Sequence, residues 1–394
     1  MAKHKVVIAG GGFGGVKLAL ELADDRRFDV TLISNHDDFW VYPTLYHVST
    51  GGPKRASSIP LSEIFAGKPI SIVIDTVTGI DRKARTISTA KNGTFTYEAG
   101  VFSLGVQTNY FGIAGLQEYS YGIKSPSDAE ELKAHLHEQL CNDQKPDLNY
   151  VVVGGGPTGI ELAGALPTYI KHLIRQHGLP KRKVHVDLIE AAPRIAPRMP
   201  KGISRKLARN LRAQGVKIYT KTAVQAQTAD ALMVNNKPIR SHTVIWTAGV
   251  MNNPFFSQNE FQLARNNKVR VDQFLQSEPG VYVIGDNADT PYSGMAQTAL
   301  YDSLFLAANL QRIASKQDPK PYVAKKPIYV LPAGPKWAAV LWGPFRIYGR
   351  LGWMLRSMAD LVEYHDYLPW KLAVKRWALL DDSEESCPLC IRKD

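Results

Sequence analysis

Short apolar runs alternate with amphipathic helical stretches along most of the chain. Residues 6–9 form an apolar run that predicts a strand, a glycine turn follows, and residues 16–23 carry the apolar face of a helix. Residues 29–33 are the next apolar run. Short apolar runs indicate buried strands, and an apolar face at helical spacing indicates a packed helix. The order strand, turn, helix, strand therefore predicts an α/β unit.

The same order of elements returns in the middle of the chain. A strand is expected at 150–153, a helix at 160–174 and a closing strand at 184–189. Solenoid repeats have periods of about 20–50 residues, and these two units lie much further apart, so we interpret them as a domain-scale duplication. Strands are also expected at 243–249 and 281–286. No low-complexity linker separates the parts, so the units are expected to pack closely, with more than one crossing of the chain between them.

The pattern changes beyond Pro335 to that of an amphipathic helix. Basic and aromatic residues interleave from Arg346 to Trp377. This combination suits a helix at a lipid surface, and a helix packed on the protein body or on a second subunit is the alternative. The apolar residues with helical spacing are Leu351, Met354, Leu355, Met358, Leu361 and Val362.

Composition narrows the class of protein. The 394 residues are 44% hydrophobic and 21% charged, which excludes wholesale disorder, a collagen-like chain and a disulfide scaffold. The three cysteines, Cys141, Cys387 and Cys390, fit a reducing cytosol. No run approaches the roughly 18 apolar residues of a spanning helix, and we expect no signal peptide. The net charge of +12 favours anionic partners. We expect no nucleic acid among them, because no reader motif is present.

Two glycine-rich turns carry the clearest chemical signal. Each lies between an expected strand and an expected helix, which is where a dinucleotide-binding turn belongs. One glycine makes the tight turn, one lets the backbone approach the pyrophosphate, and one lets the helix pack on the strand, with the helix N-terminus facing the phosphates. Two glycine-rich surface turns are the alternative. The glycines are Gly10, Gly12 and Gly15 in the first turn and Gly154, Gly156 and Gly159 in the second.

Acidic residues distinguish the two sites. The second unit ends its strand at Glu190, where a carboxylate can accept hydrogen bonds from both ribose hydroxyls and repel a 2′-phosphate, so NADH is favoured over NADPH. Glu190 lies further from its glycines than the usual ~20 residues, and a solvated charge is the alternative. The first unit ends at Ser34-Asn35 without an acid. Asp286 ends a further apolar strand and can meet a ribityl hydroxyl, unless Gly285-Asp286 is a plain turn.

These residues resemble the type II NADH dehydrogenases, the single-subunit NADH:quinone oxidoreductases. The resemblance extends from residue 5 to about residue 300, with order and spacing that fit throughout. The matching stretches are Gly10-Gly11-Gly12-Phe13-Gly14-Gly15, Pro43-Thr44-Leu45-Tyr46, 104–113, 154–164, Glu190-Ala191-Ala192-Pro193-Arg194, Trp246-Thr247-Ala248-Gly249-Val250 and Gly285-Asp286.

The resemblance implies two cofactors and assigns residues to each. For FAD these are Gly10, Gly12, Phe13, Gly14, Gly15, Ser34, Asn35, Thr44, Val77, Gly105, Asp286, Ala296 and Lys336. For NADH they are Gly154, Gly156, Thr158, Gly159, Glu190, Ala248 and Gly249.

The resemblance also implies two catalytic residues, Glu161 and Gln297. Glu161 matches a family acid near the contact between nicotinamide and flavin, although a carboxylate in the first turn of a helix is also favoured by the helix dipole. Ala296-Gln297 matches the start of a family Ala-Gln-x-Ala-x-Gln element beside the flavin and quinone. Tyr301 stands in place of the second glutamine, which departs from the family pattern. An ordinary surface lysine is the alternative for Lys336.

The resemblance implies two Rossmann-like domains and a C-terminal part. We predict a discontinuous FAD domain at 1–112 and 243–325, an inserted NADH domain at 113–242 and a membrane-interface segment at 326–394. The implied activity is non-pumping NADH:quinone oxidoreduction, peripherally bound on the cytoplasmic side of the cell membrane. The expected partners are NADH, a membrane quinone and the membrane surface, and a homodimer is left open. No metal is expected.

The cysteines weigh against related activities. A sulfide:quinone oxidoreductase needs cysteines on both sides of the flavin, and Ser125 stands where one is expected. The pair Cys387 and Cys390 lacks both an inner pair to feed it electrons and the further ligands that zinc requires. The alternatives that stay open on the sequence are a related flavoprotein reductase, of the sulfide:quinone type or acting on an iron–sulfur protein, and a non-catalytic NADH-sensing flavoprotein.

Overall fold

The computed structural model describes residues 3–141, 147–180 and 184–383. The first unit is built on a six-stranded sheet of order β19-β20-β9-β1-β2-β5, in which only the edge strand β19 runs antiparallel to its neighbour. The strands are β1 (His4–Ala9), β2 (Phe28–Ser34), β5 (Ser71–Ile74), β9 (Ala99–Phe102), β19 (Gln276–Glu278) and β20 (Val281–Val283).

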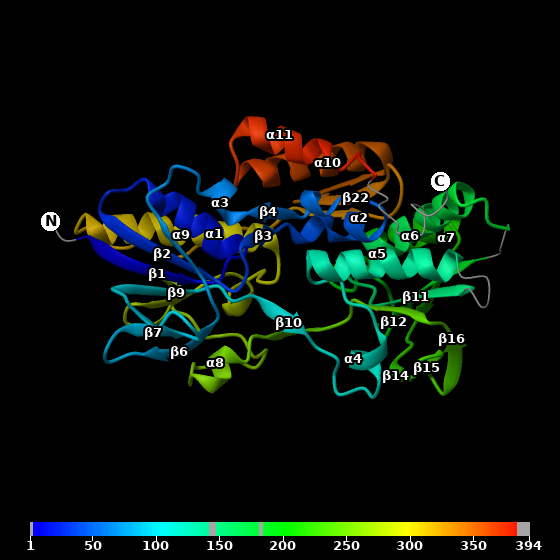
Figure 1. The fold of residues 1–394 in the computed structure, drawn as a ribbon, viewed down its shortest axis with the longest axis horizontal. Coiled ribbons are helices and arrows are strands. Elements are labelled where there is room, and N and C mark those ends of the chain that lie inside the picture. Colours follow the sequence, from blue (N-terminus) through cyan, green and yellow to red (C-terminus); the bar gives the residue numbers. More distant parts are fainter. Residues whose placement is uncertain (1–2, 142–146, 181–183, 384–394) are drawn as a thin grey trace.

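This sheet is covered on both faces. Helices α1 (Phe13–Ala23) and α9 (Ala296–Ala314) lie side by side on one face, where Val6 and Ile8 are buried beneath them (Figure 1). A cluster that includes Phe255 and Phe256 covers the other face. Burial on both faces explains why β1 reads as a continuous apolar run rather than as an alternating one. The small sheet on this second side consists of β6 (Val77–Asp81), β7 (Thr86–Thr89) and β8 (Thr94–Thr96).

The second unit repeats this architecture on a parallel four-stranded sheet of order β13-β12-β11-β17. Helices cover one face and an antiparallel meander covers the other (Figure 1). The strands are β11 (Asn149–Val153), β12 (His185–Glu190), β13 (Val216–Thr220) and β17 (Thr243–Trp246), the helices α5 (Pro126–Cys141), α6 (Pro157–Gln176) and α7 (Lys201–Ala213), and the meander β14 (Val224–Gln227), β15 (Ala231–Val234) and β16 (Lys237–Arg240).

Strand β17 corrects one expected boundary. The sequence places residues from Thr243 onward in the first unit, but β17 pairs with β11 in the second sheet. The second unit therefore extends to at least Trp246. The chain passes between the units through β10 (Val106–Thr108) and β18 (Val250–Asn252), which pair antiparallel between the two sheets. Strands β19 and β20 then complete the first sheet, so the first unit is discontinuous and the α/β fold with two Rossmann-like units is confirmed.

Short elements fill the connections between these layers. Their bounds are β3 (Asp38–Trp40), η1 (Tyr42–Thr44), α2 (Leu45–Ser49), η2 (Lys54–Ala56), β4 (Ser58–Pro60), α3 (Leu61–Ile64), α4 (Leu116–Tyr119), α8 (Phe255–Gln258) and η3 (Gly285–Asn287).

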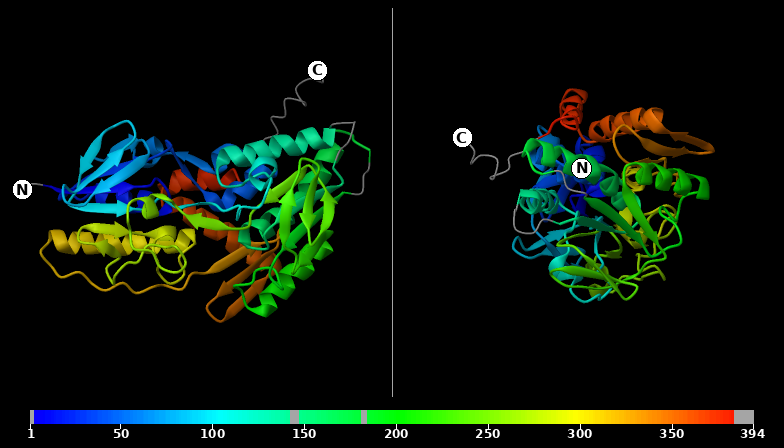
Figure 2. Two further views of the ribbon diagram at one scale, coloured as in Figure 1. Left: turned by 90° about the horizontal axis from the view of Figure 1, so that it is seen from below. Right: turned by 90° about the vertical axis from the view of Figure 1, so that its right-hand side faces the viewer.

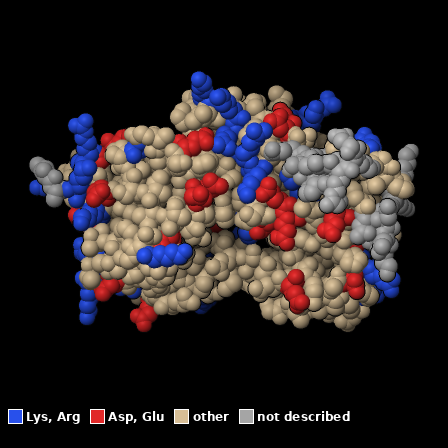
Figure 3. All heavy atoms as spheres, viewed as in Figure 1, with Lys and Arg blue, Asp and Glu red and all other residues tan. Residues whose placement is uncertain are grey.

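The C-terminal part begins with a three-stranded antiparallel sheet that the sequence pattern did not reveal. It consists of β21 (Tyr329–Pro332), β22 (Ala338–Trp342) and β23 (Phe345–Tyr348), and it lies beside α7 of the second unit (Figure 2). Helices α10 (Gly349–His365) and α11 (Trp370–Ala378) follow and form the upper edge of the molecule in Figure 1. Lys and Arg side chains project around this edge (Figure 3). In the described residues, no helix is long and apolar enough to cross a membrane.

Helix α10 has the reverse of the usual amphipathic arrangement. Its buried residues recur every four positions and include charged groups: Gly352, Arg356, Asp360 and Tyr364. The exposed face is apolar and consists of Leu351, Met354, Met358 and Val362, each more than half exposed. The helical stripe expected from the sequence therefore exists, but it faces solvent, whereas Leu355 and Leu361 are half-buried.

Buried tyrosines fix this C-terminal pair of helices to the first unit. The Tyr364 hydroxyl donates to the carbonyl of Ala56 at 2.6 Å. The Tyr367 hydroxyl donates to the carbonyl of Phe13, inside the first glycine turn, at 3.1 Å. The C-terminal segment is thus packed on the body through its polar side.

Candidate active site

The two glycine turns have nearly the same geometry. Gly10 has φ of 118° and Gly154 has φ of 114°, values that favour glycine. A Cβ at Gly15 would lie 1.9 Å from the carbonyl oxygen of Gly10. A Cβ at Gly159 would lie 1.9 Å from the carbonyl oxygen of Gly154. These four positions therefore need glycine so that each helix can pack against its own strand.

The middle glycine of each turn faces open space. A Cβ at Gly12 or at Gly156 would meet nothing within 4 Å. Both residues are the N-caps of their helices, α1 and α6, and neither helix has a side-chain cap. The free N–H groups and the positive end of the helix dipole therefore face an unobstructed surface, which fits a pyrophosphate in each turn.

The strand-end residues Ser34 and Glu190 occupy equivalent places in the two units. A Cβ at Gly11 would meet the Ser34 hydroxyl, and one at Gly155 would meet the Glu190 carboxylate. Glu190 accepts hydrogen bonds from the N–H groups of Gly155 and Ala192, both at 2.7 Å. Ser34 is buried and donates to the carbonyl of His36 at 2.6 Å, while Asn35 is exposed. One strand end therefore presents a carboxylate and the other presents a small neutral group.

Three further segments meet at the first turn. The N–H of Gly105 donates to the side chain of Asn287 at 2.9 Å, and the Asn287 amide donates back to the Gly105 carbonyl at 2.7 Å. This reciprocal pair joins the end of β9 to η3, which carries Asp286. Thr44 is buried in the neighbouring loop, where its hydroxyl donates to the Val41 carbonyl at 2.8 Å.

Asp286 lies within electrostatic range of two lysines. Burial raises the pKa of its carboxyl, while Lys268 and Lys124 oppose the increase. Burial in turn lowers the pKa of each lysine amine, and Asp286 opposes that change. Lys124 precedes α5 of the second unit, so this electrostatic cluster extends across both units. Sequence reasoning missed both lysines, because neither belongs to a recognisable motif.

Asp302 is a positioning residue that the sequence did not reveal. It is fully buried in α9 and accepts from the N–H of Gly285 at 2.9 Å and from the Tyr322 hydroxyl at 2.6 Å. Burial raises the pKa of Asp302 to about 6, against these two hydrogen bonds. Its carboxyl holds the backbone turn that presents Asp286.

The remaining residues assigned to NADH lie around the second turn. Thr158 is exposed on the first turn of α6. Ala248 and Gly249 follow β17, and a Cβ at Gly249 would lie 2.4 Å from the ring of Phe111. Phe111 is itself 62% exposed, which leaves an aromatic face free beside this turn.

The two expected catalytic residues have different environments. Glu161 lies on α6 and is 9% exposed. Burial raises the pKa of Glu161 to about 8; Arg356 opposes this increase and Asp360 adds to it. Gln297 lies with Ala296 at the start of α9, and its side-chain oxygen accepts from the N–H of Ile328 at 2.7 Å. That oxygen therefore already has a partner in the chain.

Two residues assigned to FAD have no described contact with the first glycine turn. Val77 begins β6 in the small antiparallel sheet, where it pairs with Thr89. Lys336 lies on an exposed turn before β22, beside Asn210 and Gln214 at the end of α7. The structure thus places Lys336 against the second unit, in agreement with the alternative of a surface lysine.

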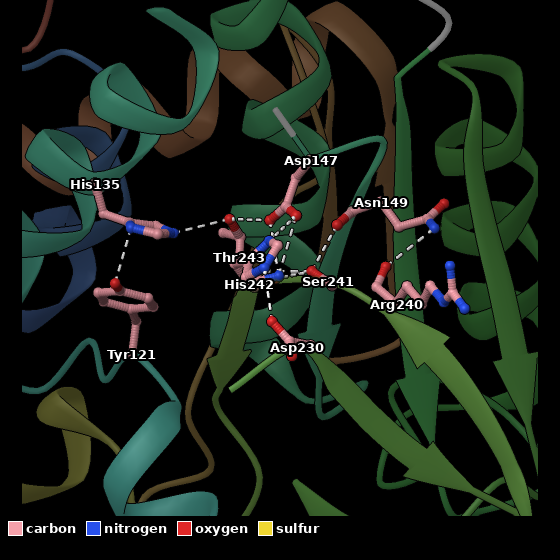
Figure 4. Close-up of polar contacts among 9 residues, drawn as sticks. All are labelled: Tyr121, His135, Asp147, Asn149, Asp230, Arg240, Ser241, His242 and Thr243. Carbon is pink, nitrogen blue, oxygen red and sulfur yellow. Dashed lines mark hydrogen bonds and ion pairs between the residues drawn. The ribbon is translucent and has the colours of Figure 1, made fainter. Parts of the chain in front are cut away.

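A polar network lies at the opposite end of the second sheet (Figure 4). Asp147 accepts from the Thr243 hydroxyl at 2.7 Å and pairs with the His242 ring at 2.8 Å. His135 contacts Thr243 at 2.9 Å and Tyr121 at 2.8 Å. Strands β11 and β17 begin here, and ligands of such folds bind at the carboxyl ends of the strands. We therefore interpret this network as structural. Among the described residues no cluster of metal-ligating side chains occurs.

Comparison with known proteins identifies the family. The family model described as pyridine nucleotide-disulphide oxidoreductase matches residues 4–303, which contain both glycine turns and Asp286. The chain belongs to the pyridine nucleotide-disulphide oxidoreductase family.

Three known proteins show what this oxidoreductase is similar to. A type II NADH:quinone oxidoreductase from Staphylococcus haemolyticus is 27% identical over 339 residues, covering 80% of this chain and 84% of the relative. Among solved structures, NDH2 from Plasmodium falciparum in complex with NADH superposes with a TM-score of 0.85 at 17% identity, covering 96% of this chain and 97% of that one. The sulfide:quinone oxidoreductase of Aquifex aeolicus superposes with a TM-score of 0.78 at 18% identity, covering 98% of each chain. The structural likenesses establish the fold of this oxidoreductase.

Proposed function

We propose that this chain is an FAD-dependent NADH:quinone oxidoreductase that works at a membrane surface. The observation that carries the proposal is the pair of equivalent glycine turns with different strand-end residues, Ser34 and Glu190. The staphylococcal relative is named a type II NADH:quinone oxidoreductase, which supports a quinone as the electron acceptor. When bound, FAD would supply the redox chemistry that links oxidation of NADH to reduction of the quinone.

The chain's own residues bind and orient the reactants. The N-termini of α1 and α6 would hold the two pyrophosphates, and Glu190 would accept from the ribose hydroxyls of NADH and repel a 2′-phosphate. Asp286 is held by the turn that Asp302 fixes, in position for a ribityl hydroxyl. Gln297 and Glu161 lie at the starts of α9 and α6, where we place the acceptor and the nicotinamide.

We propose that the C-terminal helices dock the enzyme on anionic lipid. The docking face consists of Leu351, Met354, Met358 and Val362 on α10, and exposed Trp342 and Phe345 lie on the adjoining hairpin. Exposed cations occur on the same two helices, Arg350 on α10 and Lys371 and Lys375 on α11, and on α7, which packs against β22: Arg205, Lys206, Arg209 and Arg212. An apolar helix face with basic residues around it complements a surface of anionic headgroups over acyl chains. Because NADH is an intracellular donor, this surface is assigned to the cytoplasmic side of the cell membrane.

Anaerobic reduction tests the redox function. The purified protein should carry flavin absorbance, lose it on addition of NADH, and regain it on addition of a ubiquinone or menaquinone analogue. NADPH should reduce the flavin much more slowly, because of Glu190. Sulfide and a small iron–sulfur protein serve as alternative partners in parallel reactions. Absence of bleaching by NADH would reject the dehydrogenase, and bleaching without reoxidation by any quinone would reject the acceptor.

Vesicle binding tests the docking face. Met354→Glu combined with Met358→Glu should lower binding to anionic phospholipid vesicles at least tenfold, and wild type should bind neutral vesicles more weakly. Val323→Glu is the matched control, because Val323 is 76% exposed on the loop between α9 and β21. Equal binding by both variants would contradict the assignment. A wild-type dimer that the Met354/Met358 variant separates would instead assign the face to a second copy of the chain.

A further inference from the structure

A hollow lies between the end of α7 and the start of α10, away from both glycine turns. Its volume is about 580 Å³. Asn210 and Gln214 of α7 line one side, and Pro335 and Trp337 add apolar surface from the turn between β21 and β22. Helix α7 packs against β22, and Figure 2 shows the sheet of that strand beside the helix. The hollow therefore belongs to the packed body, and Leu351 of the docking face directly follows a residue that lines it.

The hollow is positively charged. Among the described residues, the charged side chains that line it are both cations, Lys336 and Arg350. Gly349, which also lines it, is the first residue of α10, a helix with no side-chain cap and no acid in its first turn. A Cβ at Gly349 would meet only the Trp337 ring, at 4.0 Å, so the backbone at this helix end is open to a ligand. A lysine, an arginine and a helix N-terminus are groups that proteins use to bind phosphate.

The turn that carries Lys336 is held in place by α7. Lys336 has φ of 51°, a conformation that residues other than glycine adopt at a cost. The side-chain amides of Asn210 and Gln214 both donate to the carbonyl of Ala333 at 2.6 Å. The N–H of Ala333 donates to the carbonyl of Trp337 at 3.1 Å. These bonds fix the turn, so that the lysine stands at a set position beside the start of α10.

Gln214 also supplies an acceptor that lacks a donor. Its side-chain oxygen is buried and has no hydrogen-bond partner within the described residues. A buried polar atom without a partner costs free energy, so a ligand hydroxyl that donated to this oxygen would bind favourably. The hollow thus combines two cations, an uncapped helix N-terminus and an unsatisfied acceptor. A ligand that matches all of them carries a phosphate with hydroxyl groups close to it.

We propose that the hollow binds the headgroup of an anionic phospholipid whose phosphate carries a polyol, as in phosphatidylglycerol. The phosphodiester contacts Lys336, Arg350 and the N-terminus of α10, and a headgroup hydroxyl donates to Gln214. A lipid fits better than a soluble phosphate ester, because Leu351 follows Arg350 and the acyl chains would meet the docking face. The choice of a lipid rests on the proposed docking, whereas the phosphate-binding hollow itself does not.

Vesicles of equal charge test the choice of headgroup. Wild type should bind vesicles that contain phosphatidylglycerol about fivefold more tightly than vesicles with the same fraction of phosphatidylserine, whose headgroup has a carboxylate and an ammonium in place of hydroxyl groups. Lys336→Gln combined with Arg350→Gln should remove this preference in protein that melts like wild type. Arg205→Gln combined with Arg212→Gln is the matched control, because it removes two exposed charges of α7 that do not line the hollow. The control should weaken binding to both lipids equally. A preference that is absent from wild type, or that survives in the Lys336/Arg350 variant, would overturn the headgroup site.

Soluble ligands separate the hollow from the docking. Dioctanoylphosphatidylglycerol, below the concentration at which it forms micelles, should bind wild type in a calorimetric titration and bind the Lys336/Arg350 variant at least tenfold more weakly. The deacylated headgroup, glycerophosphoglycerol, should also bind wild type at least tenfold more weakly than the short-chain lipid. Equal affinity for these two ligands would overturn the lipid as the source of the phosphate, and no binding of either would overturn the site. If wild type binds the short-chain lipid but no vesicles, the proposed docking fails and the headgroup site is supported.

Discussion

Gly156 and Gly159 lie three residues apart, yet they perform different tasks. Gly159 packs against its own strand, and Gly156 faces open space with backbone angles that other residues adopt. We predict that Gly159→Ala destabilises the protein by about 1–3 kcal/mol, because its methyl group would overlap the Gly154 carbonyl. Gly156→Ala should melt like wild type but bind NADH at least tenfold more weakly, because its methyl group enters the pyrophosphate space.

Urea denaturation and NADH titration separate these two outcomes. Gly12→Ala and Gly15→Ala provide the same comparison in the first turn, with flavin content as the binding measurement. Normal NADH affinity in Gly156→Ala would show that the pyrophosphate lies elsewhere.

Motif glycines and Glu190 were predictable from the sequence because their chemistry is local. A tight turn, an N-terminal helix end and a strand-end acid all occupy fixed positions along the chain. Arg356, Lys268 and Asp302 were not predicted as functional, because their importance comes from partners that only the folded chain brings near. Asp302, for example, holds Gly285 from a helix that begins eleven residues later.

At the scale of elements, the period of α10 was predictable and its orientation was not. Apolar spacing predicts a helix with one apolar face, and that face ordinarily packs inward. Here the inward side has Arg356 and Asp360, which form an ion pair, and Tyr364, whose hydroxyl donates to a backbone carbonyl. The outward side is therefore the apolar one. Strands β21 to β23 were missed because they are short and are separated by turns that contain Gly334-Pro335 and Gly343-Pro344.

The network at the amino end of β17 gives a pH-dependent prediction. The hydrogen bond between His242 and Asp147 raises the pKa of the His242 ring, and Asp230 adds to this increase. A raised folded-state pKa stabilises the fold below the unfolded value of about 6.5, and this contribution disappears as pH rises through the folded pKa. His242→Gln should therefore cost more stability at pH 5.5 than at pH 8.5. We expect a difference of about 0.5 kcal/mol, because the ring is 39% exposed and solvent screens it.

His135 in the same network is the opposing control. Burial lowers the pKa of His135 to about 4, against the charge of Asp147. Protonation of the unfolded chain therefore opposes folding as pH falls from about 6.5 towards 4. His135→Gln should cost less stability at pH 5.5 than at pH 8.5. Urea unfolding of both variants at the two pH values measures the signs, and equal signs would refute this account.

At the scale of the molecule, the two-unit architecture was predictable because the chain repeats its strand–turn–helix signal. The residue at which the chain returns to the first unit was not predictable, because nothing in the sequence of β17 indicates which of the two sheets it joins. The C-terminal helices also prove to be part of the body. Tyr367 donates to Phe13 inside the first turn, and Arg376 pairs with Glu63 of α3.

We predict that a chain ending at residue 348 loses more than lipid binding. Removal of α10 and α11 would leave the Phe13 carbonyl without its tyrosine and expose the ring of Phe39, which stacks near Tyr367. The melting temperature should fall by several degrees, since each kcal/mol corresponds to about 1 °C in a chain of 394 residues and the two helices contribute several contacts. Flavin content after purification should fall with it. Calorimetry measures the melting temperature and absorbance measures the flavin content. An unchanged melting temperature would show that α10 and α11 do not stabilise the rest of the fold.

The equivalence of Ser34 and Glu190 has a practical consequence for engineering. The first unit already carries a small neutral residue at this corner of the scaffold. Replacement of Glu190 with serine, together with a cation placed nearby, would allow the preference between NADH and NADPH to be changed. Biosensors and recycling systems for phosphorylated nicotinamide coenzymes could then be built on this scaffold, provided that the added groups also satisfy the N–H groups of Gly155 and Ala192 that Glu190 now accepts from.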